Sequence, residues 1–286
     1  MAATPPVVLT IAGFDPSSGA GVTADLKTIA AHECYGVGCI TALTVQSTKG
    51  VRRFEAVDAR IVSETLDELV SDFSIEAVHV GMLGSAAVIT AVADFLKKAK
   101  LPHVVVDPIL KSSSGAELIG PGGTQSLLEK LVPIAEVFTP NLEEAAALTG
   151  KPVTNLDQMR EAAKRLHSMG AANLVITGGD LDKATDLLSF TTARGAETEV
   201  FKADRQRSKS THGTGCAFST ALACHLAHGR GIPEAVLLSK AYVSAAILKA
   251  YPVGKGIGPL NHLYRMGEQR RASIVVAEAE SAHSRN

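Results

Sequence analysis

The sequence predicts an α/β domain in which helices cover both faces of a central, mostly parallel sheet. Short runs of β-branched residues alternate with longer segments of helical periodicity, and strands separated by ten or more helical residues form parallel βαβ units. With 286 residues, 46% of them hydrophobic, the chain can bury the core that three layers need. Distinctive residues follow several predicted strands, at the sheet edge where such folds bind ligands.

Six strands of the sheet are expected from the β-branched runs. In chain order they are Val7–Ala12, Val37–Leu43, Ala77–Met82, His103–Asp107, Val137–Thr139 and Leu174–Thr177. Two further runs, Asp186–Thr191 and Glu197–Ala203, flank a short segment around Gly195 and predict a hairpin at the sheet edge.

Segments with apolar residues at helical spacing are expected to be helices. They are Gly21–His32, Ala59–Asp72, Ser85–Ala99, Gly123–Leu131, Leu142–Leu148, Leu156–Met169, Thr214–His228 and Pro233–Lys249. We see no linker that would divide the chain, so we expect one domain over residues 6–265 and a polar C-terminal tail over residues 266–286.

The charge balance argues against nucleic acid as a partner. Lys and Arg total 28 against 29 Asp and Glu, and the chain has no extended basic run. The four cysteines show neither CxxC nor zinc-site spacing, which favours free thiols in a reducing compartment. The N-terminus lacks a positively charged region, and the apolar run Val7–Ala12 is too short for a signal or membrane helix. We therefore expect a cytoplasmic protein that does not act at membranes.

The most informative segment is Thr211–Cys216, a Gly-rich turn that leads into a small-residue, apolar helix. The first N–H groups of a helix lack acceptors within it, and the helix dipole adds partial positive charge there. Gly213, Thr214 and Gly215 therefore predict an anion hole suited to a phosphoryl group in transfer. Cys216 stands at its edge, where we expect the thiol to lose its proton more easily than in water. The pattern is also typical of a turn before a packed helix.

The segment Gly19–Ala24 formally matches the dinucleotide-binding fingerprint G-x-G-x-x-A. We reject that interpretation, because the first glycine lies seven residues beyond the strand end and the second strand offers no acidic residue for a ribose. The loop that begins at Gly13 instead predicts a substrate-facing segment. Asp25, one turn into the following helix, either stabilises the helix start or hydrogen-bonds a ring amine or hydroxyl group.

Asn141 and Glu144 are spaced as a capping box, with Asn141 as N-cap. Glu144 could also hold a water molecule on Mg²⁺, which prefers to keep several waters, and both roles can coexist. The diglycine turn at Thr177–Gly179 could contact nucleotide phosphates through its backbone, or be a plain turn. Of the histidines only His212, beside the anion hole, attracts attention. The serine-hydrolase motif G-x-S-x-G and the P-loop motif are absent.

Together these motifs resemble those of the ribokinase-like superfamily and, more closely, of the hydroxymethylpyrimidine/phosphomethylpyrimidine kinases of thiamin biosynthesis. The resemblance covers about Val7 to Tyr264. The matching stretches are Leu9–Gly21 with Asp25–Thr28, Ile40–Thr48, Gly81–Leu83, Asp107–Pro108, Thr139–Asn141 with Glu144, His212–Cys216 and Gly256–Pro259. The resemblance implies a ribokinase-like fold, ATP and Mg²⁺ as requirements, and a homodimer or larger homo-oligomer.

The resemblance also implies a role for each matching residue. The pyrimidine pocket would be lined by Gly13, Asp25, Gln46, Met82 and Ile109. Of these, Asp25 and Gln46 would hydrogen-bond the substrate, while Met82 and Ile109 would pack on its ring. The nucleotide would contact Asn141, Thr177, Gly179 and Thr214, and the metal Glu144 and Asp107. The catalytic set would be Gly213, Gly215 and Cys216, with Cys216 as the group that accepts or steers the proton.

Two positions depart from the family pattern. Thr177 stands before the diglycine, where the family often has Lys. Lys111 precedes Ser112–Gly115, where the family often has Lys-Ser-Gly after the aspartate loop. Either change could move or remove a cationic phosphate contact.

The expected activity is ATP-dependent phosphorylation of 4-amino-5-hydroxymethyl-2-methylpyrimidine, first to the monophosphate and then to the diphosphate. The nearest alternative is a pyridoxine/pyridoxal kinase, because the two rings are similar in size; Gln46 and Met82 favour the pyrimidine. A non-catalytic ligand-binding protein on the same fold remains open on account of Thr177. An NAD-dependent oxidoreductase is disfavoured by the missing ribose acid.

Overall fold

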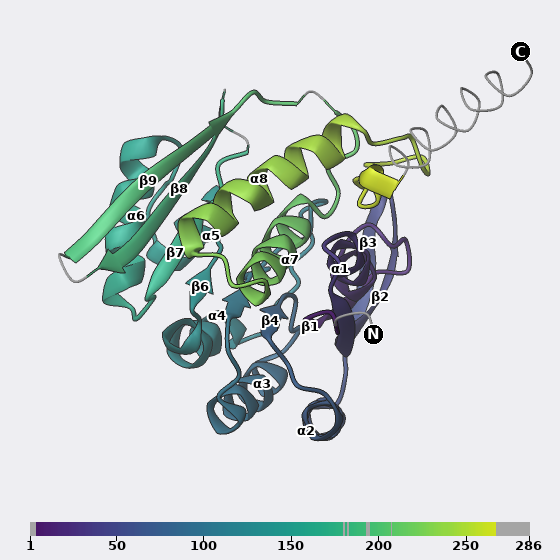
Figure 1. Ribbon diagram of the computed structural model, residues 1–286. Helices are drawn as coiled ribbons and strands as arrows, with labels where there is room; N and C mark the ends of the chain where they lie inside the picture. The colour runs from purple at the N-terminus through teal and green to yellow at the C-terminus, as the bar shows by residue number, and fades with distance from the viewer. Residues whose placement is uncertain (1–3, 180, 182, 193–194, 207, 267–286) are drawn as a thin grey trace, which may run out of the picture.

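A sheet that pairs nine strands within the described residues lies in the middle of the computed structural model (Figure 1). The structure describes residues 4–179, 181, 183–192, 195–206 and 208–266. The strands lie in the order β3-β2-β1-β4-β5-β6-β7-β8-β9. Their bounds are β1 Val7–Phe14, β2 Tyr35–Ser47, β3 Gly50–Ala56, β4 Ala77–Val80, β5 Val104–Val106, β6 Val137–Phe138, β7 Asn173–Ile176, β8 Ala184–Thr192 and β9 Gly195–Ala203. In this spatial order, neighbours from β2 through β1, β4, β5 and β6 to β7 pair in parallel, whereas the pairs β2–β3, β7–β8 and β8–β9 are antiparallel. The prediction of a mostly parallel sheet is confirmed.

Helices cover both faces of the sheet (Figure 1). Their bounds are α1 Gly21–Ala31, α2 Ala59–Asp72, α3 Ala86–Ala99, α4 Gly123–Ser126, α5 Leu142–Thr149, α6 Leu156–Ser168, α7 Thr214–Ala227 and α8 Ile232–Leu248. Successive strand residues point to opposite faces: Ala77 packs with the layer that contains α7 and α8, and Val78 packs with the layer that contains α2, α3 and α6. The predicted three-layer α/β/α arrangement is confirmed.

Local sequence determines where several helices begin. The side chains of Asp58, Ser85 and Asn155 each accept a hydrogen bond from a backbone N–H in the first turn of the helix that follows. Helix α7 differs, because its N-cap is Gly213, in the left-handed region at φ 80°, with no side-chain cap. Its first N–H groups are therefore not shielded by a capping side chain.

Two expected elements need correction, and one strand was not expected. Strand β2 runs on to Ser47 and turns back as β3, which the sequence did not predict because its alternation is interrupted by charged Arg52 and Arg53. The expected helix Gly123–Leu131 is only one α-helical turn; it continues as a π-helical turn over Leu127–Leu131 and a 3₁₀ turn over Val132–Ile134. Pro133 has no N–H to continue the helical pattern there.

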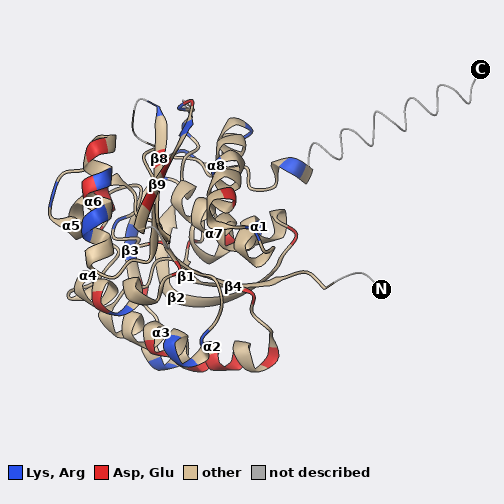
Figure 2. Ribbon diagram, turned by 60° about the vertical axis from the view of Figure 1, so that its left-hand side comes forward, with Lys and Arg blue, Asp and Glu red and all other residues tan. Residues whose placement is uncertain are grey.

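The expected tail over residues 266–286 lies, apart from Met266, outside the described residues. Within the described ranges, no helix combines the length and the apolar character needed to cross a membrane. Lys and Arg are interspersed with Asp and Glu over the outer helices α3 and α6 (Figure 2), which is unlike the single-signed surface of a nucleic-acid site.

The strand order reverses at β1, and this reversal marks the site. The chain passes from β1 to β2 on one side and then crosses to β4 on the other. In open α/β sheets, ligands bind beyond the carboxyl ends of the strands at such a switch point. Gly13 at the end of β1 and Met82 just beyond β4 lie there.

Candidate active site

An apolar surface forms where β1 and β4 end. A Cβ atom on Gly13 would lie 2.9 Å from the Met82 sulfur, so a glycine is needed for the methionine to approach the strand. Met82 also belongs to a small apolar cluster that includes Ile109 and Phe54. The structure thus brings together the three residues expected to pack on a substrate ring: Gly13, Met82 and Ile109.

Gln46 lies inside β2, not beyond its end as expected, because the strand continues into the hairpin with β3. Its side-chain amide is within hydrogen-bond distance of Thr44 Oγ1 at one end and His212 Nε2 at the other. Beside it is an opening of about 720 Å³, lined by Val45–Ser47, Lys49–Arg52 and Ser114–Ala116. Gln46 therefore lines an opening large enough for a small ligand, which Gly13, Met82 and Ile109 do not line.

Asp25 does not face this opening. Its carboxylate is fully buried and accepts hydrogen bonds from the hydroxyl groups of Thr10, at 2.7 Å, and Thr220, at 3.0 Å. His79 Nδ1 lies 3.3 Å from it. The expectation that Asp25 is presented to the substrate is thus corrected: the carboxylate has no exposed surface, and each of its oxygens already accepts a bond from a protein hydroxyl.

The start of α7 is pressed against the N-terminal glycine loop. A Cβ atom on Gly213 would lie 1.9 Å from the backbone oxygen of Gly19. The backbone of Gly21 in turn hydrogen-bonds to the Cys216 thiol. Gly213, Gly215 and Cys216 therefore lie directly beside the loop that follows β1, although the two segments are far apart in the sequence.

The Cys216 thiol differs electrostatically from the expectation. Burial raises its pKa well above the usual range, and the neighbouring carboxylates of Asp107 and Asp25 raise it further. We expected the helix start to lower this pKa. The correction is that desolvation and two nearby acids outweigh the helix dipole, so in the ligand-free protein the thiol is neutral.

Asp107 and Glu144 form an acidic pair beneath the start of α7. Asp107 follows β5 directly, and its Oδ2 is buried without a hydrogen-bond partner. Burial raises the pKa of Asp107, and the charges of Glu144 and Asp25 add to this. Burial likewise raises the pKa of Glu144 to about 7, against hydrogen bonds from backbone amides that lower it. Such a pair would be stabilised in its charged form by a cation.

Glu144 also caps a helix, as predicted. Its Oε2 accepts a hydrogen bond from the Asn141 N–H, and Asn141 Oδ1 accepts one from the Glu144 N–H, which is the full capping box. Asn141 pairs with Thr177 through a parallel β-bridge, and Gly178 N–H donates to Asp186. The structure therefore places Asn141 and Thr177 side by side at the next strand ends.

Lys111, the lysine considered for a phosphate contact, and a second lysine, Lys240, both have ion-pair partners. Lys111 lies on an exposed loop and pairs with Glu117 at 3.0 Å. Lys240, on α8, is buried and pairs with Asp186 at 2.7 Å. The diglycine turn after Thr177 is thus attached to a buried ion pair through Asp186.

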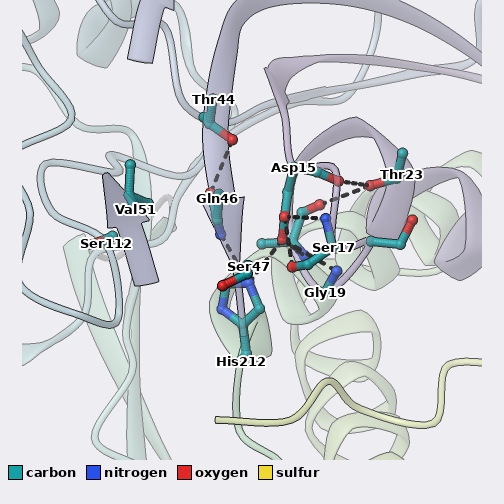
Figure 3. Close-up of polar contacts among 12 residues, drawn as sticks. Asp15, Ser17, Gly19, Thr23, Thr44, Gln46, Ser47, Val51, Ser112 and His212 are labelled. Atoms are coloured by element: carbon teal, nitrogen blue, oxygen red, sulfur yellow. Dashed lines mark hydrogen bonds and ion pairs between the residues drawn. The ribbon is translucent and has the colours of Figure 1, made fainter. Parts of the chain in front are cut away.

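The sequence did not reveal the role of Asp15. Its carboxylate accepts hydrogen bonds from Ser17, Gly19 and Ala20 within its own loop, and His212 Nε2 lies 2.8 Å away (Figure 3). Burial raises the pKa of Asp15, but the hydrogen bonds of His212 and Ser17 outweigh burial and lower it. An Asx-turn spacing in Asp15–Ser17 was the available signal; the long-range partner was not.

Comparisons with known proteins agree with this geometry. The sequence profile of the family described as phosphomethylpyrimidine kinase matches residues 15–261. The chain belongs to the phosphomethylpyrimidine kinase family. The hydroxymethylpyrimidine/phosphomethylpyrimidine kinase of Streptomyces coelicolor is 40% identical over 266 residues, which cover 93% of this chain and 97% of the relative.

The chain is also similar to a longer protein and to a solved structure that carries another name. A thiamine biosynthesis bifunctional protein of Geobacter sulfurreducens is 43% identical over 90% of the chain, and the chain spans about half of its length, 52%. A pyridoxal kinase of Bacillus subtilis, solved as an ADP complex, superposes with a TM-score of 0.83 at 34% identity; the match covers 92% of this chain and all of that one. The ribokinase-like fold expected from the motifs is thereby confirmed.

Proposed function

We propose that this kinase transfers a phosphoryl group from ATP to 4-amino-5-hydroxymethyl-2-methylpyrimidine and then phosphorylates the product to the diphosphate. The names of its relatives support this substrate. One structural observation carries the proposal: the uncapped start of α7 meets the unpartnered, buried oxygen of Asp107. A Cβ atom on Gly215 would lie 3.7 Å from this oxygen, so N–H groups that can stabilise phosphoryl oxygens lie beside a carboxylate that can hold Mg²⁺, and phosphoryl transfer uses both.

Each group of site residues is proposed to have a separate role in the reaction. Gly13, Met82 and Ile109 provide an apolar surface for the pyrimidine ring, and Gln46 supplies polar contacts at its edge. Backbone N–H groups at Gly213–Gly215 stabilise the negative charge that spreads over the transferred phosphoryl oxygens. Cys216 accepts or steers the proton of the attacking hydroxymethyl group. Asn141, Thr177, Gly179 and Thr214 are proposed to contact the nucleotide.

The acidic pair fits Mg²⁺. Asp107 presents a buried oxygen without a partner, and Glu144 is an oxygen donor whose charged form needs a neighbouring cation. Among the described residues no group of three or more His, Cys, Asp or Glu could enclose a metal ion, and Mg²⁺ usually retains several waters. When bound, Mg²⁺ would neutralise charge on the phosphates. Asp107 and Glu144 would then hold it directly or through water.

A second function is favoured by one observation. The Bacillus subtilis structure similar to this chain is named a pyridoxal kinase, and the ring-packing surface of Met82 and Ile109 is not specific to a pyrimidine. Pyridoxal therefore remains the alternative substrate.

Self-association also stays part of the proposal, since Leu43 and Val45 on β2 expose apolar side chains. We further propose a cytoplasmic location, which the four free cysteines support.

ADP release by the purified protein tests the proposal. Mg-ATP would be supplied with hydroxymethylpyrimidine, pyridoxal or ribose separately, and the products weighed by mass spectrometry. Mono- and diphosphorylated pyrimidine would support the proposed activity. Turnover with pyridoxal alone would transfer the assignment to vitamin B6 salvage. No ADP with any of the three would favour the non-catalytic binding protein.

Replacing Gln46 with alanine should raise KM for the pyrimidine about tenfold, because a hydrogen-bonding group at the ring edge is lost. KM for ATP should not change, since Gln46 lies on the opposite side of the site from Asn141 and Thr177. Steady-state kinetics with each substrate varied in turn measure both constants. Equal losses for the two substrates would contradict the pocket assignment.

Two variants of Glu144 separate helix capping from metal binding. Glu144→Gln keeps an oxygen that can accept the Asn141 N–H but removes the charge. It should raise the Mg²⁺ concentration for half-maximal activity about tenfold with little change in Tm. Glu144→Ala should show the same Mg²⁺ effect and also lose about 1 kcal/mol of stability with the capping box. If the glutamine variant kept the wild-type Mg²⁺ dependence, Glu144 would be a capping residue only.

A further inference from the structure

His212 connects the loop after β1 to the side chain that faces the substrate. Its ring is buried and lies against Gly19, where a Cβ atom would come within 2.3 Å of its Cδ2. Its Nε2 is 2.8 Å from Asp15 Oδ2 and 3.1 Å from the terminal amide of Gln46 (Figure 3). One ring nitrogen is thus shared between a carboxylate and an amide.

Asp15 determines that His212 Nε2 is protonated. An ionised carboxylate can only accept hydrogen bonds, so His212 Nε2 must carry a hydrogen and donate it. A nitrogen that donates cannot also accept a hydrogen bond from Gln46 Nε2, the atom placed 3.1 Å away. The amide nitrogen and oxygen of a glutamine are assigned from such networks and not observed directly. This contact therefore requires the Gln46 oxygen to face His212, where it accepts the longer arm of a three-centre bond from the Nε2–H whose shorter arm goes to Asp15.

Thr44 leads to the same conclusion independently. Its single hydroxyl hydrogen is within reach of two acceptors, the backbone oxygen of Phe14 at 2.9 Å and Gln46 Oε1 at 3.1 Å. Both oxygens can only accept, but the amide can be turned to present its nitrogen and the backbone cannot, so the nearer Phe14 oxygen takes the hydrogen. Thr44 Oγ1 is then left to accept, which requires the Gln46 nitrogen, not its oxygen, to face it. Turning the amide by 180° satisfies both residues at once.

We infer that His212 is a positioning residue that holds the Gln46 amide in one orientation, with its oxygen toward His212 and its nitrogen toward Thr44, and so determines which ring edge the site accepts. In this orientation the amide nitrogen donates to Thr44 Oγ1, and the amide oxygen shares the single His212 Nε2–H with Asp15 in a three-centre bond. One N–H and one oxygen lone pair remain for a ligand. They are complementary to a ring edge that has an acceptor nitrogen next to an amino group, as an aminopyrimidine does.

The consequence for specificity rests on the proposed function. A substrate that offers both the ring nitrogen and the amino group uses both free positions of the fixed amide. A ring with hydrogen in place of the amino group leaves the oxygen unpaired, so it gains less from the orientation. Loss of His212 should therefore weaken the aminopyrimidine more than its desamino analogue.

The test compares His212→Ala with His212→Gln, which can place an N–H near the position of Nε2. Asp15 keeps its bonds from Ser17, Gly19 and Ala20 in both variants, so the loop retains most of its contacts. With His212→Ala we expect KM for the aminopyrimidine to rise about tenfold, and KM for 5-hydroxymethyl-2-methylpyrimidine and for ATP to change less than about threefold. With His212→Gln the preference should return to within about threefold of wild type.

Two results would overturn the inference. Equal losses for the amino and desamino substrates would mean that His212 affects the site without orienting Gln46. An unchanged preference in His212→Ala would mean that the amide is held by Thr44 alone. Thermal denaturation of each variant confirms that a folded protein is compared.

A measurement on the ligand-free protein keeps the inference separate from the proposed activity. The side-chain amide signals of Gln46, assigned with Gln46→Ala, report by NMR whether the amide is held. We expect slow rotation about the Gln46 Cγ–Cδ bond and dispersed amide proton shifts in wild type and His212→Gln. In His212→Ala we expect shifts typical of a solvated amide. Free rotation about the Gln46 Cγ–Cδ bond in wild type would overturn the inference even if the protein phosphorylates the pyrimidine. A held amide in a protein that turns over no pyrimidine would instead contradict the proposed function alone.

Discussion

Replacing Cys216 with alanine is expected to lower kcat about 10²- to 10⁴-fold if its thiol acts as the proton acceptor. The thiol lies at the start of α7, beside Asp107 and the Gly19–Gly21 backbone. Burial and the charges of Asp107 and Asp25 raise its pKa, so it is a strong base once it has lost its proton, and a cation held by the acidic pair would favour that loss. Single-turnover phosphoryl transfer measures the chemical step without product release.

The pH dependence of wild type and variant gives a second measure of this role. A base with a raised pKa is mostly protonated at neutral pH, so kcat/KM of the wild type should keep rising with pH beyond about 9, the region above the ordinary thiol pKa. The alanine variant should lose that rise. Cys216→Ser is the control, because a hydroxyl group can still steer a proton but ionises much less readily. A change below about tenfold in Cys216→Ala would mean that the thiol contributes only packing.

The second large effect is expected from Gly213→Ala. Gly213 adopts the left-handed conformation at φ 80°, and a Cβ atom there would lie 1.9 Å from the Gly19 backbone oxygen. Neither backbone can move away without displacing the start of α7. A displacement of about 1 Å in a catalytic group can cost about 10²-fold in rate, and the forced overpacking should cost about 1–3 kcal/mol of stability.

Gly122→Ala is the matched control for this substitution. Gly122 is also a helix N-cap in the left-handed conformation, at φ 73°, but no atom lies within 4 Å of the added Cβ. It should therefore show only the left-handed backbone strain, about 1–2 kcal/mol, and no loss of kcat. If both alanine variants were destabilised alike and remained active, the contact between the two glycine loops would not be important for the site.

The sequence was sufficient for the layers of the fold and for much of the site's apolar surface. Short, nearly continuous apolar runs such as Ala77–Val80 and Val104–Val106 are buried on both faces, so their hydrophobic pattern is strong. Strand β3 was missed because its exposed, charged residues lack such a pattern. The capping box of Asn141 and Glu144 was predictable because it depends on residues only three positions apart.

What the sequence could not reveal depends on residues distant in the chain. Asp25 was expected to face the substrate from its position on α1, but Thr10, His79 and Thr220 bind it from three other elements. The raised pKa of Cys216 likewise depends on how deeply the thiol is buried and on Asp107, which is distant in the sequence. Local patterns carry no information about such partners.

The pair of Asp15 and His212 also has a consequence for the order of events during synthesis. The two residues are 197 positions apart, and a ribosome adds about 5–20 residues per second, so about 10–40 s pass between their appearances. Throughout that interval the glycine loop after β1 lacks the histidine and the helix start that press against it. Most of the sheet can pair earlier, because β1 to β7 are complete before residue 180. The nascent chain can therefore contain seven strands of the sheet before the helices α7 and α8, which cover one face and bring the helix start of the site, are made.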